Sequence, residues 1–399
     1  MSPKQSLPST AFWRASPDPV GSAPLRILHL HSSFDAGGKE LRAAKLINAF
    51  GNGISHAIVS GERDALGAAK AIDAGIDVAY PRDFPALAGK PTPGRLQRLA
   101  QAMKGYDLIL TYNWGAMDAV MAHTVFCGFH KLPPLVHHED GFNSDEANGL
   151  RMSRNWYRRI ALGRTSSLVV PSRVLEGIAL DVWQQPRSRV RLVPNGIDVA
   201  AYASKPKPNA LPRIIKRPGE KWLGTLAGLR PVKNLPRLVR AFADLPEEWQ
   251  LVILGEGPER DAIREEAMRL ELAHRVHLPG FVADPSKAVG LFDLYALSSD
   301  SEQFPISVVE AMAAGLAVAS PAVGDVANMV SGDNSPFISR PGDDGALAEN
   351  IRLLAGDETL REAIGAANRA KAVKEYDEKS MISTYKSIYA LAMRRASFP

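Results

Sequence analysis

The chain has 399 residues, which is too long for one domain of ordinary size and suits two. Hydrophobic residues make up 45% of it and charged residues 23%, which are values of a globular protein and exclude a disordered one. No apolar run reaches the ~18 residues that a membrane span needs. The single cysteine, Cys127, excludes an intrachain disulfide and a zinc cluster of thiolates. We therefore expect a reducing, cytoplasmic setting.

The net charge of +5 is concentrated in one window. Between residues 151 and 191 nine arginines face only two carboxylates, Glu176 and Asp181. A nucleic-acid-binding protein usually carries a broad basic face, so this window indicates a local patch or a solvated helix face and no nucleic-acid partner.

Residues 1–24 contain five prolines among serines and alanines and no continuous apolar core, which predicts a disordered tail. An apolar strand over 25–31 follows, then a glycine-rich turn and a helix with one apolar face. Further strands alternate with helical stretches at 54–60, 76–80, 107–111, 135–138, 168–171 and 190–194. This alternation predicts a parallel sheet with helices on both faces, spanning residues 25–200.

Four prolines interrupt the alternation in the predicted linker, residues 201–219. A second alternation of strands and helices occupies 220–375, and residues 376–399 form a helix that we expect to cross back to the first domain. The fold class is therefore α/β, with two doubly wound, Rossmann-like domains. Such sheets bind ligands beyond the carboxyl ends of their strands, so two facing domains would hold the site in the cleft between them.

The most informative motif follows the strand predicted at 294–298. Seven residues separate Glu302, in a polar loop, from Glu310, in the second turn of the next helix. Glu302 can reach a sugar hydroxyl, and Glu310 can accept hydrogen bonds from a ribose diol. The alternative is a helix start that carries two solvated acids.

Between these acids, Phe304 and Pro305 introduce the helix. A proline suits the first turn because its missing N–H is not needed there. The free N–H groups of Ile306 and Ser307 would then point into the cleft, where they can hold a phosphate.

Two cations follow the first strand of the second domain, at Arg230 and Lys233. Both can neutralise a leaving diphosphate and stabilise charge that develops in the transition state. The alternative is a pair of solvated cations.

A second polar loop, residues 137–140, ends a strand of the first domain with the sequence His-His-Glu-Asp. His138 and Asp140 are the candidate site residues of this segment. His137 should tolerate change better, because side chains alternate across a strand. A buried, hydrogen-bonded core histidine is the alternative here.

Together these motifs resemble the retaining glycosyltransferases of family 4, which have the GT-B fold. The resemblance rests on the Glu-x7-Glu motif. Phe-Pro follows its first glutamate closely, and its second glutamate begins the run Glu-Ala-Met-Ala-Ala-Gly. Four further segments agree in order with the family: 37–40 with its glycine loop, 194–198 with the entry to its linker, and 254–258 and 280–282 with the strand ends that face the nucleotide. It covers roughly residues 25 to 390.

The resemblance implies roles for further residues. It directs Gly38 toward a diphosphate or acceptor, and Gly255 and Phe281 toward the nucleotide. For the family's histidine near the transferring sugar, alignment by the strand end picks His138, whereas alignment by Gly141 picks Asp140. Lys233 stands where the family keeps its phosphate-binding lysine. The position of the family's conserved arginine is occupied by Gly228. Arg230, two residues later, would take over the role of that arginine. The family needs no obligatory metal, so we expect no cofactor.

The resulting prediction is a retaining transferase that moves a sugar from a nucleotide-diphosphate sugar to a saccharide or lipid-linked acceptor. Cell-surface polysaccharide or lipopolysaccharide synthesis is the usual setting of such enzymes. The alternatives are a GT-B nucleotide-sugar epimerase and a non-catalytic nucleotide-sugar-binding protein. Arg151, Arg154 and Arg158 share one face of a helix. This pattern predicts peripheral attachment to the anionic inner surface of the cell membrane. Alternatively Trp156 and Ile160 pack into the core and the arginines are merely solvated.

Overall fold

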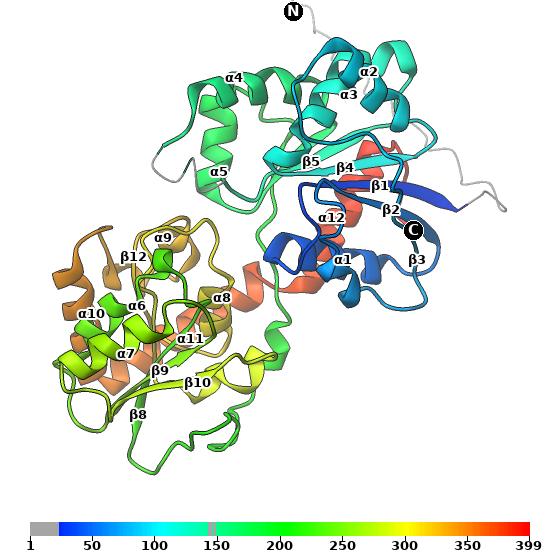
Figure 1. Ribbon diagram of the computed structural model, residues 1–399. Coiled ribbons are helices and arrows are strands. Elements are labelled where there is room, and N and C mark those ends of the chain that lie inside the picture. The colour runs from blue at the N-terminus through cyan, green and yellow to red at the C-terminus, as the bar shows by residue number, and fades with distance from the viewer. Residues whose placement is uncertain (1–23, 143–145, 147–148) are drawn as a thin grey trace, which may run out of the picture. The chain divides into compact units, whose positions relative to one another are not determined.

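The computed structural model describes residues 24–142, 146 and 149–399 (Figure 1). The tail predicted at 1–24 lies outside these residues, except for Pro24. The chain forms two compact units. One contains the chain as far as His137, with Ala161–Ser167 and Tyr385–Pro399; the other contains His138–Ile160 and Leu168–Thr384.

The strands between residues 25 and 192 form one seven-stranded sheet in the order β3-β2-β1-β4-β5-β6-β7. The pairs β1–β2, β1–β4, β2–β3 and β6–β7 are parallel, and β1 runs in register with β2 from Leu25 opposite Ile54. The strands are β1 (Leu25–His31), β2 (Ile54–Ser60), β3 (Asp77–Ala79), β4 (Leu108–Tyr112), β5 (Leu135–His138), β6 (Ser167–Val170) and β7 (Val190–Leu192). Its helices are α1 (Gly38–Phe50), α2 (Pro93–Ala102), α3 (Met117–His130), α4 (Met152–Ala161) and α5 (Arg173–Gly177).

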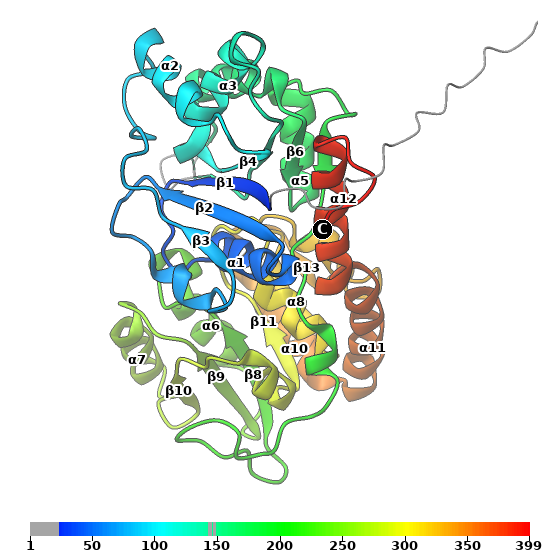
Figure 2. The same ribbon diagram turned by 90° about the vertical axis from the view of Figure 1, so that its right-hand side faces the viewer.

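A six-stranded parallel sheet follows, in the order β10-β9-β8-β11-β12-β13 (Figure 2). Its strands are β8 (Lys221–Leu226), β9 (Trp249–Leu254), β10 (Val276–Gly280), β11 (Leu294–Ala296), β12 (Val318–Pro321) and β13 (Ile338–Ser339). Its helices are α6 (Leu235–Phe242), α7 (Arg260–Arg269), α8 (Ile306–Ala313), α9 (Val326–Met329), α10 (Asp344–Gly356) and α11 (Glu358–Glu375).

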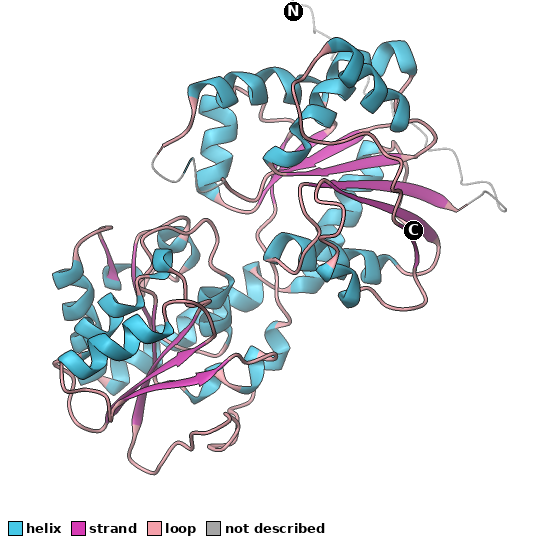
Figure 3. Ribbon diagram, viewed as in Figure 1, coloured by secondary structure: helices cyan, strands magenta, loops and turns pink. Residues whose placement is uncertain are grey.

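Both sheets have helices on their two faces, which explains why their strands are continuous apolar runs rather than alternating ones (Figure 3). Trp222 and Trp249 are fully buried in separate core clusters of the second sheet, one on each face. The fold class is thus the predicted one, two Rossmann-like parallel sheets.

The last helix, α12 (Glu378–Ala392), has an aromatic face that packs on the first sheet's unit. Tyr389 lies edge-on to Phe50, with ring centroids 6.0 Å apart, and Phe398 lies 4.7 Å from the same ring. No helix of the described residues is long and apolar enough to span a membrane.

Candidate functional site

The predicted donor residues gather at the carboxyl ends of the second sheet's strands. Lys233 follows β8, and Glu302 follows β11. The Lys233 ammonium donates to a Glu302 carboxylate oxygen at 2.5 Å, and the Ser299 hydroxyl donates to the same oxygen at 2.7 Å. The Lys233 and Glu302 side chains are 14% and 11% exposed. A charge pair that is partly open to solvent can exchange its partner for a ligand.

Helix α8 begins at Ile306, directly after this loop. Pro305 is the residue before the helix and has extended backbone, so its predicted place inside the first turn is wrong by one residue. Within the described chain no acceptor receives the N–H of Ile306 or Ser307. These N–H groups lie at the positive end of a helix and can bind an anion.

Phe304 is buried, and its ring packs edge-on against Tyr376 at 5.8 Å between centroids. Its side chain therefore belongs to the core. Only its backbone remains for the predicted contact with a donor.

Glu310 also lies in the interior, in the second turn of α8, where the Tyr202 hydroxyl donates to one carboxylate oxygen at 3.1 Å. Burial raises the pKa of Glu310 to about 7, although the Tyr202 hydrogen bond acts in the opposite direction. The carboxyl is therefore half-protonated near neutral pH. The sequence carries no local signal for Tyr202, because it is 108 residues away.

A cavity of about 560 Å³ opens at the carboxyl ends of β8, β9 and β10 in the same sheet. Gly228, Gly255, Glu256 and Phe281 are among its lining residues. At Gly255, φ is +140° and a Cβ atom would lie 1.9 Å from the Ala227 carbonyl oxygen, so only glycine fits. The Phe281 ring is 72% exposed and available for stacking. Arg230 is exposed on the loop that follows β8.

The predicted glycine loop of the first sheet lies between β1 and α1. Gly38 opens α1, and a Cβ added there would meet nothing within 4 Å. At Gly37 a Cβ would lie 2.6 Å from a carboxylate oxygen of Glu40, which is buried and paired with Lys39. Nothing in the 37–40 segment indicated from sequence that Glu40 is buried.

The end of β5 and the loop that follows it differ from the donor site because their polar residues are largely buried. His137 is fully buried, and its Nδ1 lies 2.8 Å from the Thr111 hydroxyl. His137 is thus a buried, hydrogen-bonded histidine, as in the alternative given for this segment, and its tolerance to substitution stays a prediction. His138 is also buried, whereas Asp140 is half-buried.

The predicted arginine face of α4 is corrected by the structure. Arg158 is 0% exposed, and it donates to Glu139 at 3.3 Å and to Glu146 at 3.2 Å. Arg154 also donates to Glu146, at 3.0 Å. Arg158 cannot reach a membrane, because buried carboxylates hold it inside the protein.

The outer surface of α4 is apolar instead. Met152, Trp156 and Ile160 recur every four residues and are exposed, so the reading in which Trp156 and Ile160 pack into the core is wrong. The Arg159 guanidinium lies 5.0 Å from the Trp156 ring.

A second cavity, of about 230 Å³, lies at the carboxyl ends of β2 and β3. Arg63, Tyr80, Arg82 and Phe84 are among its lining residues. Sequence reasoning missed this pocket, although the run from Tyr80 to Phe84 follows a strand and combines rings with a cation.

Two family models match the chain in succession. Residues 36–201 match "Glycosyltransferase Family 4", and residues 208–371 match "Glycosyl transferases group 1". Among curated relatives, the chain is 26% identical over 212 residues to N-acetyl-alpha-D-glucosaminyl L-malate synthase of Bacillus anthracis. It is 32% identical over 215 residues to phosphatidyl-myo-inositol mannosyltransferase of Mycobacterium tuberculosis. The matches cover 53% and 49% of this chain and 56% and 53% of those relatives, so the chain spans about half their length.

The fold also matches solved GT-B structures. The Anabaena protein HepE in complex with UDP superimposes with a TM-score of 0.74 at 22% identity, covering 91% of this chain and 99% of that one. HepE in complex with UDP-glucose gives a TM-score of 0.70 over 91% and 99% of the two chains. Both parallel sheets of this chain thus have counterparts in a solved structure.

Proposed function

Because the chain consists of a glycosyltransferase family 4 domain followed by a glycosyltransferase group 1 domain, we propose that it transfers a sugar from a nucleotide-diphosphate sugar to an acceptor with retention of configuration. The observation that carries this proposal is the accessible Lys233–Glu302 pair beside the unengaged N–H groups of α8.

The diphosphate is held by Lys233, Arg230 and the N–H groups of Ile306 and Ser307. Charge builds up on the leaving diphosphate as the sugar bond breaks, and fixed cations and N–H dipoles stabilise that charge. They supply what a metal ion would otherwise supply, so the proposed reaction needs none.

The nucleoside occupies the cavity at the ends of β8, β9 and β10, where Gly255 permits close approach and Phe281 offers an aromatic face. The UDP complexes of HepE support this class of donor. A ribose diol would compete with Tyr202 for Glu310, and it would bind the ionised carboxylate best.

When the donor binds, its diphosphate replaces Glu302 as the ion-pair partner of Lys233, and Glu302 then contacts the transferring sugar. Retention then follows from attack on the face from which the diphosphate departs. A diphosphate oxygen accepts the acceptor's proton, the new glycosidic bond forms, and the bond to the diphosphate breaks. His138 and Asp140 are the further residues proposed to contact this sugar.

The acceptor is a saccharide or a lipid-linked saccharide, and the cavity lined by Arg63, Tyr80 and Phe84 is its proposed pocket. The name of the mycobacterial relative, a phosphatidyl-myo-inositol mannosyltransferase, supports a lipid acceptor. Cell-surface polysaccharide or lipopolysaccharide synthesis is the proposed setting. The apolar stripe of α4, Met152, Trp156 and Ile160, would lie in the headgroup region of a membrane.

Binding of UDP, measured by calorimetry, tests the donor site. Lys233→Ala should raise the dissociation constant about tenfold or more, because a desolvated charge-assisted bond is lost. Lys287→Ala, which removes an exposed lysine of the same unit, is the matched control and should leave it unchanged. Equal affinity in wild type and Lys233→Ala would overturn the proposed diphosphate site.

Product analysis separates the transferase from the other two classes. Conversion of UDP-glucose that requires an added acceptor supports transfer. A new sugar nucleotide formed without acceptor would instead indicate an epimerase, and tight binding without any turnover would indicate a binding protein.

A further inference from the structure

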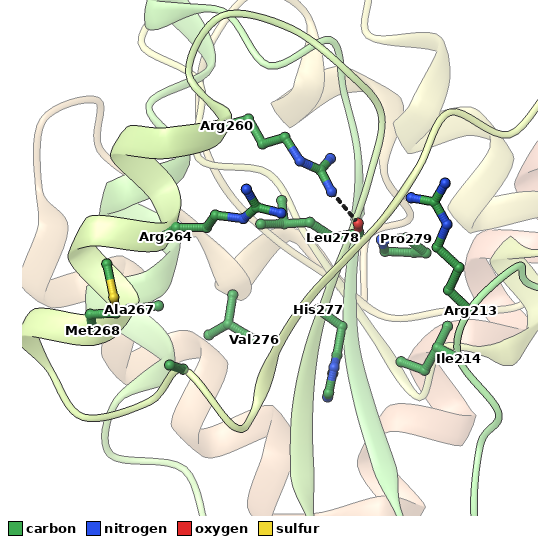
Figure 4. A pocket seen from close by; sticks show the side chains of 11 residues that line it. Arg213, Ile214, Arg260, Arg264, Ala267, Met268, Val276, His277, Leu278 and Pro279 are labelled. Carbon is green, nitrogen blue, oxygen red and sulfur yellow. Dashed lines mark hydrogen bonds between the residues drawn. The ribbon is translucent and has the colours of Figure 1, made fainter.

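A cavity of about 410 Å³ lies at the edge of the second sheet, beside β10, and it is separate from the proposed donor site. Figure 4 shows Arg260 and Arg264 extending from α7 on one side of it and Arg213 from the opposite side. None of the residues assigned above to donor, acceptor or catalysis lines it. Its volume is in the range of sites for small molecules.

The lining is strongly cationic. Three guanidinium groups contribute to it, those of Arg213, Arg260 and Arg264, and no carboxylate is among the residues that line it. His277 adds no charge at neutral pH, because burial lowers its pKa and its Nε2 lies 2.9 Å from the Gln250 side-chain oxygen. The positive charge of these side chains favours an anion. Glu256 and Asp261 lie against Arg260 and Arg264, whereas Arg213 carries its charge alone among the described residues.

Protein contacts orient the arginines but leave some of their N–H donors available for a ligand. Arg260 donates to the Leu278 carbonyl at 2.8 Å and to Glu256 at 3.2 Å, which holds its planar head at the cavity (Figure 4). Arg264 lies 3.6 Å from Asp261. Arg213 has no hydrogen-bond or ion-pair partner in the described part of the chain. Because each guanidinium has five N–H donors, all three keep donors for a ligand.

Apolar side chains complete the cavity: Ile214, Val276 and Met268 line it between the arginines. A ligand that matches this lining has an anionic head and a ring or hydrocarbon body. Three guanidinium forks exceed what a single carboxylate can satisfy and suit the three terminal oxygens of a phosphate.

We propose that this cavity is a second ligand site, which binds a small phosphorylated molecule. The phosphate lies among Arg213, Arg260 and Arg264, and the body of the ligand lies on the apolar lining. Soluble phosphate esters and lipid headgroups share this chemistry, so the test has one arm for each source.

The soluble arm titrates phenyl phosphate into the full-length protein and measures heat. We expect saturable binding that weakens by about tenfold or more in Arg213→Gln/Arg264→Gln, because charge-assisted hydrogen bonds are lost. Arg269→Gln is the matched control on α7, because Arg269 bonds to Glu266 and does not line the cavity. Lys233→Ala should also leave this binding unchanged, which separates the cavity from the donor site.

The lipid arm measures co-sedimentation with phosphatidylcholine vesicles that contain phosphatidic acid. Binding that the Arg213→Gln/Arg264→Gln variant loses assigns the phosphate to a lipid; binding of phenyl phosphate alone assigns it to a soluble molecule. Absence of saturable binding in both arms overturns the site. So does a loss of phenyl phosphate binding in Lys233→Ala but not in the double arginine variant. Circular dichroism confirms that each variant is folded.

Discussion

Polar side chains follow strands in both sheets, but the protein uses them differently. At the end of β5 in the first sheet, His137, His138 and the following Glu139 are buried, and Glu139 is paired with the buried Arg158. After β8 and β11 of the second sheet, Lys233 and Glu302 pair where solvent still reaches them. The same sequence pattern thus produces structural pairing in one region and an accessible charged site in the other. Exposure, rather than residue type, distinguishes them.

The comparison predicts the largest effect at Arg158. Arg158→Met takes the Arg158 cation away from the buried carboxylates of Glu139 and Glu146, of which Glu146 keeps Arg154, so the free energy of unfolding should fall by about 3–5 kcal/mol. Denaturant unfolding measures this change. Arg159→Met, on the same helix, is the control and should change stability little. A loss at Arg158 as small as that of the control would contradict the structural role.

At Glu310 the predicted effect depends on pH. Its pKa is about 7 in the folded protein and 4.5 in the unfolded chain, so the folded state binds more protons between these values. The free energy of unfolding should therefore decrease as the pH rises from about 5 to about 8, by up to about 3 kcal/mol. Glu310→Gln should remove this decrease, whereas Glu349→Gln, an exposed control, should keep it. Parallel curves for wild type and Glu310→Gln would show that burial does not raise this pKa.

Glu302 should separate activity from stability. Glu302→Gln should lower turnover of UDP-glucose about 10²-fold, a typical loss for one positioned polar group at a reaction centre. Stability should change by less than about 1 kcal/mol, because the ion pair with Lys233 is partly exposed. Steady-state kinetics and thermal unfolding of the same preparation measure both. A large stability loss with normal turnover would place Glu302 with the structural group after β5.

The loop after β5 provides the converse test. Asp140→Asn and His138→Ala should lower turnover about 10²-fold if either contacts the sugar. His137→Ala should instead lower stability by about 1–3 kcal/mol, because it removes a buried side chain together with its hydrogen bond to the Thr111 hydroxyl. The split between kinetics and unfolding assigns each residue to one role. Loss of turnover at His137 alone, with unchanged stability, would reverse the assignment.

The smallest predicted effect concerns the outer stripe of α4. Replacing Trp156 and Ile160 with serine should weaken binding to anionic vesicles about tenfold, because two apolar side chains no longer enter the headgroup region. Co-sedimentation at low salt measures this. Val373→Ser, at an exposed apolar position of α11, is the control. Vesicle binding that survives the α4 change would exclude this helix as the contact.

The strand–helix alternation and the loop containing Glu302 could be predicted from sequence because their signals are local. A buried parallel strand requires a continuous apolar run. The first residues of any helix, here Ile306 and Ser307, have N–H groups without an intrahelical acceptor, whatever the rest of the fold. These features do not depend on what packs against them.

Only the tertiary structure decided which of those polar groups remain accessible. On α4, the spacing showed which arginines share a face but not which face is inward, and Glu139 and Glu146 draw Arg158 into the interior. Likewise Tyr202 and Glu310 meet across 108 residues, and Arg213 reaches the cavity beside α7 from the segment before β8. The physical reason is that periodicity is a property of one segment, whereas burial and pairing depend on the partners that the fold brings together.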